Sequence, residues 1–381
     1  MASSPPPDAT IRGLDGIRGL AIVLVVLWHC ASRTNFPPAR MGLLQPIVLG
    51  GWSGVDLFFG LSGFLITKLI LDEERATGAL DLRGFYIRRA LRILPAYYLV
   101  LAADLFLLPA ASLFGSVRSA EGPRPLEVVS LLTYWSNYYY AQTLTNPPPA
   151  LGVFWSLCVE EHFYLLWPPL LCLVRSRGLR RVLAAGVCAL LPVLRWSAAA
   201  TTPAAVLHVL SHFRVDSILW GALAALVFDE AVRRPRARRV ILLATLGFVV
   251  LLFATGHLGV SPTRLGHSAG LSALAALAAA LARAVAAAPR GAVARAFELR
   301  PLRGLGRVSY GMYLLHFQAI DIAAAQTVAL LPQATPTSYA LLALASVGYA
   351  YAAAWILFRV YERRFLALKA RFTPARRAPP D

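Results

Sequence analysis

The segment Leu14–His29, LDGIRGLAIVLVVLWH, begins with charged and glycine residues and continues as an apolar run that ends in Trp28 and His29. An apolar run of about 20 residues is long enough to cross the hydrocarbon core of a bilayer as a helix. Similar runs recur as far as Trp355, too many for the core of one soluble domain. Trp28 and His29 stand where the cleavage site of a leader peptide needs small side chains, so we predict an uncleaved first span.

The composition agrees with this interpretation. The chain is 58% hydrophobic and 15% charged, and its mean hydropathy is +0.61. A formal charge of +18 would suggest nucleic-acid binding in a soluble protein. Here the arginines lie between apolar runs, which indicates membrane topology and anionic lipid headgroups. We predict an all-α, polytopic helical bundle in the plasma (inner) membrane, in contact with lipid, with no nucleic-acid partner. The four cysteines lie within or beside apolar runs and lack the spacing of metal sites. We therefore expect neither a disulfide framework nor a metal site.

The positive charges predict the topology. Once the apolar runs are drawn as spans, all but seven of the 37 Lys and Arg residues fall on one side of the membrane. That side is cytoplasmic by the positive-inside rule, and both termini lie there. The outer side keeps only Arg33, Arg40, Arg118, Arg124, Arg195, Arg214 and Arg264. The ten expected spans are roughly 14–32, 53–71, 93–114, 152–174, 182–199, 213–231, 240–257, 266–286, 308–330 and 337–359.

The domain organisation is simple. Residues 1–10 are expected to be a disordered N-terminus, 11–366 a single membrane domain, and 367–381 a basic, Pro-rich cytoplasmic tail. One long outer connection, at about 115–151, contains a cluster of tyrosines and Trp135. Such a cluster usually marks an interfacial segment. A surface on which a substrate stacks is the alternative.

Ionisable residues inside a span cost several kcal/mol, so each is a candidate for function. The first span carries Asp15, Arg18 and His29. Arg18 and His29 are eleven residues apart, which places them within roughly 20° of one helix face and about 16 Å apart along the axis. Asp15 precedes Arg18 by one turn, at ion-pair spacing. We therefore expect Arg18 and His29 to line one conduit that leads from a charged cytoplasmic mouth to a buried imidazole.

A second group of polar residues begins the fourth span, in the segment Trp155–Tyr164. A carboxylate here, Glu160 above all, is suited to orient an imidazole from another span. Glu161 and His162 are equally explained as part of an ordinary helix start, where acidic groups complement the helix dipole.

Three weaker signals complete the set. The small residues of Gly54–Phe64 predict close helix packing in the second span. Arg214 and Asp216 are as readily a local ion pair as a site. His316 is a candidate for catalysis, although a hydrogen bond to a neighbouring helix is the interpretation that we favour.

Together these segments resemble the acyltransferase-3 family of integral membrane acyltransferases, which modify sugars, polysaccharides, peptidoglycan and some macrolides. The resemblance covers about 11–366. The first span of the family carries a motif in which ten residues separate an arginine from a histidine. Arg18 and His29 match this motif. Four further blocks match in order: Gly54–Thr67, Tyr86–Pro95, Trp155–Pro168 and Gly306–His316.

Four positions depart from the family pattern. Cys158 stands where the family commonly has a small hydroxyl residue, and His162 where it has Gln. Gly311 replaces a usual Ser, and Glu362–Phe365 lacks the usual Pro. These departures affect side-chain detail more than the class of reaction.

The resemblance implies transfer of an acyl group from acyl-CoA, acetyl-CoA by default, to a hydroxyl. His29 would be the general base or a transient acyl carrier, with Glu160 holding its tautomer and Asp15 completing the catalytic set. Arg18, Arg88, Arg89 and Arg92 are the expected ligands of the CoA phosphates. Trp155, Ser156, Tyr164 and His316 are the expected substrate contacts.

The acceptor stays open from the sequence: a carbohydrate and a glycosylated or macrolide natural product fit equally well. Acyl length and oligomeric state are also open. A secondary transporter that exports a small molecule is the main alternative, because ten spans with buried charges fit that class too.

Overall fold

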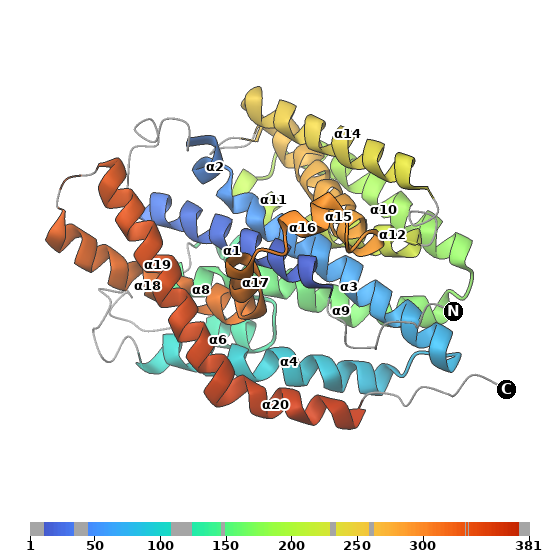
Figure 1. Ribbon diagram of the computed structural model, residues 1–381, viewed down its shortest axis with the longest axis horizontal. Coiled ribbons are helices and arrows are strands. Elements are labelled where there is room, and N and C mark those ends of the chain that lie inside the picture. The colour runs from blue at the N-terminus through green and yellow to red at the C-terminus, as the bar shows by residue number, and fades with distance from the viewer. Residues whose placement is uncertain are drawn as a thin grey trace.

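The computed structural model describes residues 11–33, 45–107, 124–145, 149–228, 234–258, 263–331, 333 and 335–372. Within these ranges every regular element is a helix, as predicted for an all-α chain (Figure 1). Each of the ten predicted spans contains all or part of a long helix. These helices are α1 (Arg12–Arg33), α3 (Gly54–Thr77), α4 (Leu82–Ala102), α9 (Phe154–Leu173), α10 (Arg177–Ala198), α12 (Ser211–Leu226), α14 (Pro235–Ala254), α15 (Leu271–Ala287, preceded by the π-helical turn η4, Gly266–Gly270), α18 (Ser309–Leu330) and α19 (Pro336–Leu357).

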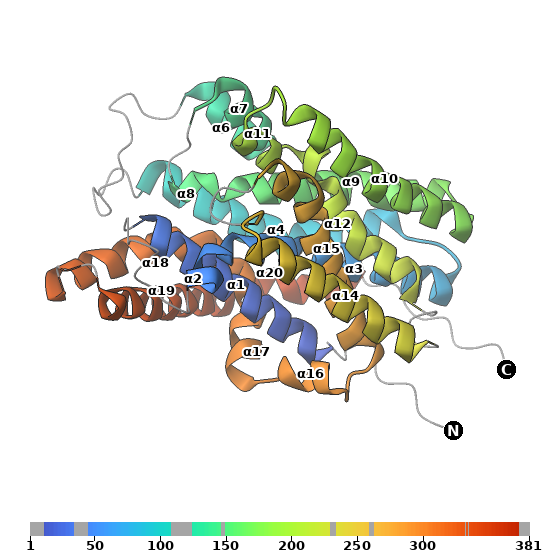
Figure 2. The same cartoon turned by 90° about the horizontal axis from the view of Figure 1, so that it is seen from above.

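The other helices are short, and they either connect the long ones or follow α19. They are α2 (Gln45–Leu49), η2 (Gly51–Ser53), η3 (Ala103–Leu107), α6 (Pro125–Leu132), α7 (Ser136–Thr143), α8 (Pro149–Gly152), α11 (Ala204–Val209), α16 (Ala292–Ala296), α17 (Arg300–Arg307), η5 (Phe358–Glu362), α20 (Arg363–Leu368) and η6 (Lys369–Phe372). Figures 1 and 2 show α18 and α19 paired at one end of the molecule, with α10, α12, α14 and α15 gathered at the other. Helices α1, α3 and α9 run between these two groups.

Among the residues that the structure describes, six helical segments are long and apolar enough to cross a membrane: Arg12–Ser32, Gly51–Thr77, Arg177–Ala198, Pro235–Ala254, Gly266–Ala287 and Pro336–Leu368. They establish a polytopic, helical membrane protein. The total of ten spans and their orientation remain predictions.

Helix α4 differs most from its predicted span. It begins at Leu82 rather than near residue 93, because the Asp81 side chain caps it by accepting a hydrogen bond from the Gly84 backbone N–H at 2.9 Å. The arginines of this stretch lower its hydropathy, which hid the helix from the span prediction. Residues 108–114 of that span lie outside the described residues.

Glycines let α1 pack closely against the segment around α17. A Cβ atom on Gly16 would lie 1.8 Å from the carbonyl oxygen of Phe297, and one on Gly19 would lie 2.0 Å from that of Leu302. The predicted close packing of the second span is confirmed, since a Cβ on Gly63 would lie 1.9 Å from the carbonyl oxygen of Ile218 in α12.

Two buried ion pairs tie the helices together. Arg214 Nη2 of α12 lies 2.7 Å from Asp56 Oδ1 of α3, and Arg195 Nη1 of α10 lies 2.7 Å from Asp216 Oδ1 of α12. The local pair of Arg214 with Asp216, one of the two interpretations that the sequence left open, does not form. Residues two apart on a helix point about 200° away from each other, so each of the two reaches a different neighbouring helix.

The aromatic cluster of the outer connection packs against the protein. The ring of Tyr134 stacks on Tyr97 of α4 at 4.2 Å between centroids, and the Tyr138 hydroxyl is 3.1 Å from His212 Nδ1. Residues 1–10, part of the outer connection (115–123 and 146–148) and the tail beyond 372 lie outside the described residues. None of the four cysteines forms a disulfide with another described residue.

Candidate active site

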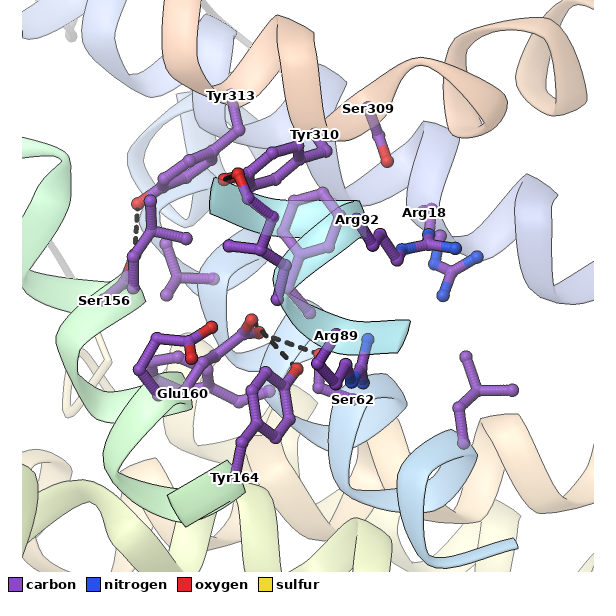
Figure 3. A pocket seen from close by; sticks show the side chains of 17 residues that line it. Arg18, Ser62, Arg89, Arg92, Ser156, Glu160, Tyr164, Ser309, Tyr310 and Tyr313 are labelled. Carbon is purple, nitrogen blue, oxygen red and sulfur yellow. Dashed lines mark hydrogen bonds between the residues drawn. The ribbon is translucent and has the colours of Figure 1, made fainter. Parts of the chain in front are cut away.

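A cavity lies between five helices (Figure 3). Helices α3, α4, α9 and α18 each contribute several residues from one face, and α1 contributes Arg18. The lining residues are Arg18 of α1, Val55, Phe58, Phe59, Ser62 and Leu65 of α3, Arg89, Arg92 and Ile93 of α4, Ser156, Leu157, Glu160, Glu161 and Tyr164 of α9, and Ser309, Tyr310 and Tyr313 of α18.

One side of the cavity is strongly basic. Figure 3 shows Arg18 and Arg92 next to each other there, and Arg92 is exposed. The Arg89 guanidinium lies 4.3 Å from the centre of the Tyr164 ring, and its Nε has no hydrogen-bond partner among the described residues. Arg18 Nη1 lies 3.4 Å from Asp15 Oδ1, so the predicted ion pair is confirmed. Three guanidinium groups around one cavity make a site suited to a polyanion.

A carboxylate occupies the middle of the cavity. Ser62 Oγ donates to Glu160 Oε1 at 2.8 Å, and the Tyr164 hydroxyl donates to Glu160 Oε2 at 3.1 Å. Both oxygens of Glu160 are thus held in place, one by α3 and one by α9 itself. Glu161 lines the same cavity.

Two hydroxyl groups meet on the side away from Arg18 and Arg92. Ser156 Oγ and the Tyr313 hydroxyl are 2.7 Å apart, joining α9 to α18 (Figure 3). Tyr313 is 7% exposed and Ser156 4%, so the pair is shielded from solvent.

His29 belongs to a separate hydrogen-bond chain. His316 Nδ1 is 2.7 Å from the Tyr313 carbonyl oxygen, and His29 Nδ1 is 2.9 Å from the Val25 carbonyl oxygen. Because a carbonyl only accepts, Nδ1 of each neutral ring carries the hydrogen. His316 Nε2, 3.2 Å from His29 Nδ1, is then an acceptor for His29.

This chain of bonds leaves the lone pair of His29 on Nε2, which has no hydrogen-bond partner among the described residues. The tautomer is the one that a general base needs. The expected hydrogen bond between His316 and a neighbouring helix is confirmed.

The structure differs from two expectations about this region. Within the described residues Glu160 bonds Ser62 and Tyr164, and it makes no hydrogen bond to His29. Arg18 lines the cavity, but His29 does not. The His29 ring lies 4.9 Å from His316, and His316 lies 5.6 Å from Tyr313, which does line the cavity. The side chains of His316 and Tyr313 therefore connect His29 to the cavity that Arg18 lines.

The remaining predicted residues are divided between the cavity and its surroundings. Ser156, Tyr164, Arg89 and Arg92 line it. Arg88 does not, because its guanidinium bonds Glu73 Oε2 at 2.7 Å and the Phe372 carbonyl oxygen at 2.6 Å. Two predicted substrate contacts, Trp155 and His316, also lie outside it. Trp155 packs between Phe59, 6.0 Å away, and His208, 5.0 Å away.

Sequence reasoning missed several cavity residues. Ser62, Tyr310 and Tyr313 carry no charge, and within the family-like blocks that contain them only helical spacing from a candidate site residue marks them. Tyr313 lies one turn before His316, and Ser62 lies at i, i+4 and i+7 spacing with Phe58 and Val55. The partner of Ser62, Glu160, lies 98 residues further along the chain.

A polytopic helical bundle that holds a basic cavity with a carboxylate and hydroxyl groups is a framework suited to a membrane-embedded enzyme. The chain belongs to the acyltransferase-3 family: the family profile, described as an acyltransferase domain, matches residues 11–359.

Curated relatives agree with this assignment. The peptidoglycan O-acetyltransferase OatA of Listeria monocytogenes is 26% identical over 82% of this chain and 50% of its own length. The putative peptidoglycan O-acetyltransferase YrhL of Bacillus subtilis is 31% identical over 81% of this chain and 48% of its own length. The O-acetyltransferase OatA of Staphylococcus aureus is 24% identical over 81% and 50%. The chain spans about half the length of these relatives. No solved structure matches it.

Proposed function

We propose that the chain is a membrane O-acyltransferase that moves an acyl group, acetyl by default, from acyl-CoA to a hydroxyl of a carbohydrate. The observation that carries this proposal is the cavity in which Arg18, Arg89 and Arg92 surround the approach to Glu160, Ser156 and Tyr313. Membership of an acyltransferase family supports the reaction. The names of the relatives support a carbohydrate acceptor, with peptidoglycan the first to test.

The basic side is the proposed donor site. The phosphates of CoA are anionic, and guanidinium groups bind phosphates through charge-assisted, often bidentate hydrogen bonds. Exposed Arg92 would meet the phosphates first, and Arg18 and Arg89 would hold them further in. Asp15 fixes the Arg18 side chain by their ion pair. The predicted topology places this side toward the cytoplasm, where acyl-CoA is found.

The transfer step uses His29 as base. Nε2 of His29 takes the proton of the acceptor hydroxyl, whose oxygen attacks the thioester carbonyl carbon. The carbon–sulfur bond breaks, and the CoA thiolate leaves and takes the proton from the imidazolium, which restores neutral His29. In the alternative route, Nε2 attacks the thioester carbonyl carbon and the CoA thiolate leaves. The acceptor oxygen then attacks the acyl-imidazole, the carbon–nitrogen bond breaks, and the proton of the acceptor hydroxyl passes to the thiolate.

In the proposed reaction, His316, Tyr313 and Glu160 have separate roles. His316 fixes the His29 tautomer, the role first expected of Glu160. Tyr313 lines the cavity and contacts His316, which in turn contacts His29, so both side chains have to move for the thioester and Nε2 to meet. Glu160 instead orients Ser62 and Tyr164 and balances the charge of the nearby arginines.

Purified protein with radiolabelled acetyl-CoA and peptidoglycan fragments tests the proposal. We expect label on the glycan and release of CoA by the wild type, and a loss of about 10²–10⁴-fold in kcat for His29→Ala with acetyl-CoA binding retained. His257→Ala, whose ring bonds Thr263 in a distant turn, is the control and should stay active.

Full activity of His29→Ala would remove the catalytic assignment. Absence of CoA release with every acceptor, a glycosylated macrolide included, would favour the transporter instead.

A further inference from the structure

One arginine of the cavity is held by an aromatic ring rather than by a counter-ion. Arg18 pairs with Asp15, but no hydrogen bond or ion pair to the Arg89 guanidinium is found among the described residues. The guanidinium carbon of Arg89 instead lies 4.3 Å from the centre of the Tyr164 ring, on the neighbouring helix α9 (Figure 3). A guanidinium over an aromatic face is attracted by the ring, and its N–H donors stay available to another partner.

The Tyr164 ring is itself held in place. Its hydroxyl donates at 3.1 Å to Glu160 Oε2, one turn earlier on α9. The other oxygen of Glu160 accepts from Ser62 of α3 at 2.8 Å. Tyr164 is only 3% exposed, so neighbouring side chains also pack around it. A chain of contacts therefore runs from Ser62 through Glu160 and Tyr164 to Arg89.

We propose that Tyr164 is a positioning residue of the donor site, whose ring holds the Arg89 guanidinium in place for the phosphates of CoA. The inference rests on the proposed function, because it takes the arginine cavity as the CoA site. Glu160 and Glu161 both lie within electrostatic reach of Arg89. An ion pair with either carboxylate would neutralise the guanidinium, whereas a stack on the ring leaves its positive charge for the donor.

The size of the effect follows from the order that the ring imposes on Arg89. A free arginine side chain has to be immobilised when the phosphates bind, and the entropy lost in that step weakens binding roughly three- to tenfold. Removal of the ring should therefore raise the Kd for acetyl-CoA by about this factor. An effect that passes through Arg89 has to vanish when Arg89 is absent, whereas a general loss of packing does not.

A double-mutant cycle on the purified full chain, in one detergent, tests the inference by titration calorimetry with acetyl-CoA. Tyr164→Leu should raise the Kd roughly three- to tenfold. Tyr164→Phe keeps the ring and should change the Kd less than about twofold. In the Arg89→Ala background, addition of Tyr164→Leu should produce no further increase.

Phe163→Leu is the matched control. Phe163 is the preceding residue of α9 and is equally buried, at 3% exposed, but it does not line the cavity. Its ring stacks on Trp167, with 5.6 Å between the centroids. The variant removes a buried aromatic ring from the same helix and should change the acetyl-CoA Kd less than about twofold.

Four results would overturn the inference: an unchanged Kd in Tyr164→Leu, an equal rise in Tyr164→Phe, an equal rise in Phe163→Leu, or a further rise when Tyr164→Leu is added to Arg89→Ala. If the wild type does not bind acetyl-CoA, the proposed function itself fails. Should Tyr164→Leu not fold, Tyr164→Met, which also lacks a ring, takes its place in the cycle.

Discussion

Removal of Asp56 offers the sharpest test of how the bundle is held together. Its Oδ1 accepts from Arg214 Nη2 at 2.7 Å, and the two side chains are 1% and 0% exposed. Within the described residues, Nε and Nη1 of Arg214 make no hydrogen bond. Asp56→Ala thus leaves a guanidinium buried without its counter-ion, at a cost of about 3–5 kcal/mol in the free energy of unfolding.

Denaturant titration in a fixed detergent, followed by tryptophan fluorescence, measures that cost. The variants are Asp56→Ala, Arg214→Ala and the double mutant. Because the second change removes the uncompensated charge, the double mutant should be less destabilised than the sum of the two single mutants by about 2 kcal/mol or more.

Asp72→Ala is the control. Asp72 pairs with Lys68 at 2.8 Å, but its side chain is 46% exposed. Such a pair contributes up to about 1 kcal/mol. Equal stability of Asp56→Ala and Asp72→Ala, or strict additivity in the double mutant, would refute the reasoning.

Three further outcomes are expected. Arg89→Ala should raise the acetyl-CoA Kd roughly 10- to 100-fold, because it removes a charge-assisted contact, whereas Arg88→Ala should change the Kd less than about threefold. Titration calorimetry compares the two variants, and equal effects would contradict the proposed donor site. Arg18→Ala should raise the apparent KM for acetyl-CoA more than it lowers kcat in steady-state kinetics, and an unchanged KM would exclude it from donor binding. Gly16→Val should lower the melting temperature in detergent, because the added Cβ meets the Phe297 carbonyl oxygen at 1.8 Å, whereas Gly186→Ala, with no atom within 4 Å of its Cβ, should not.

The long helices could be predicted because apolar runs of this length have few alternatives in a bilayer. The start of α4 could not, since a helix whose early turns carry Arg88 and Arg89 resembles a basic loop in hydropathy. Only the cap at Asp81 signalled its true beginning.

The site shows the same division between local and long-range information. Spacing within one helix correctly placed Asp15 beside Arg18. It could not tell that Glu160 would turn to Ser62, or that His29 would pair with His316, 287 residues away. Those pairings depend on which helices are neighbours, and a single sequence does not contain that information in its spacing.

The most direct test of the central claim is the location of bound donor. A cryo-electron microscopy map of the protein with a non-hydrolysable acetyl-CoA analogue should show the phosphates on Arg18, Arg89 and Arg92 and the acyl group toward the Ser156–Tyr313 pair. Density for the analogue outside this cavity, with the three arginines unchanged, would contradict the account.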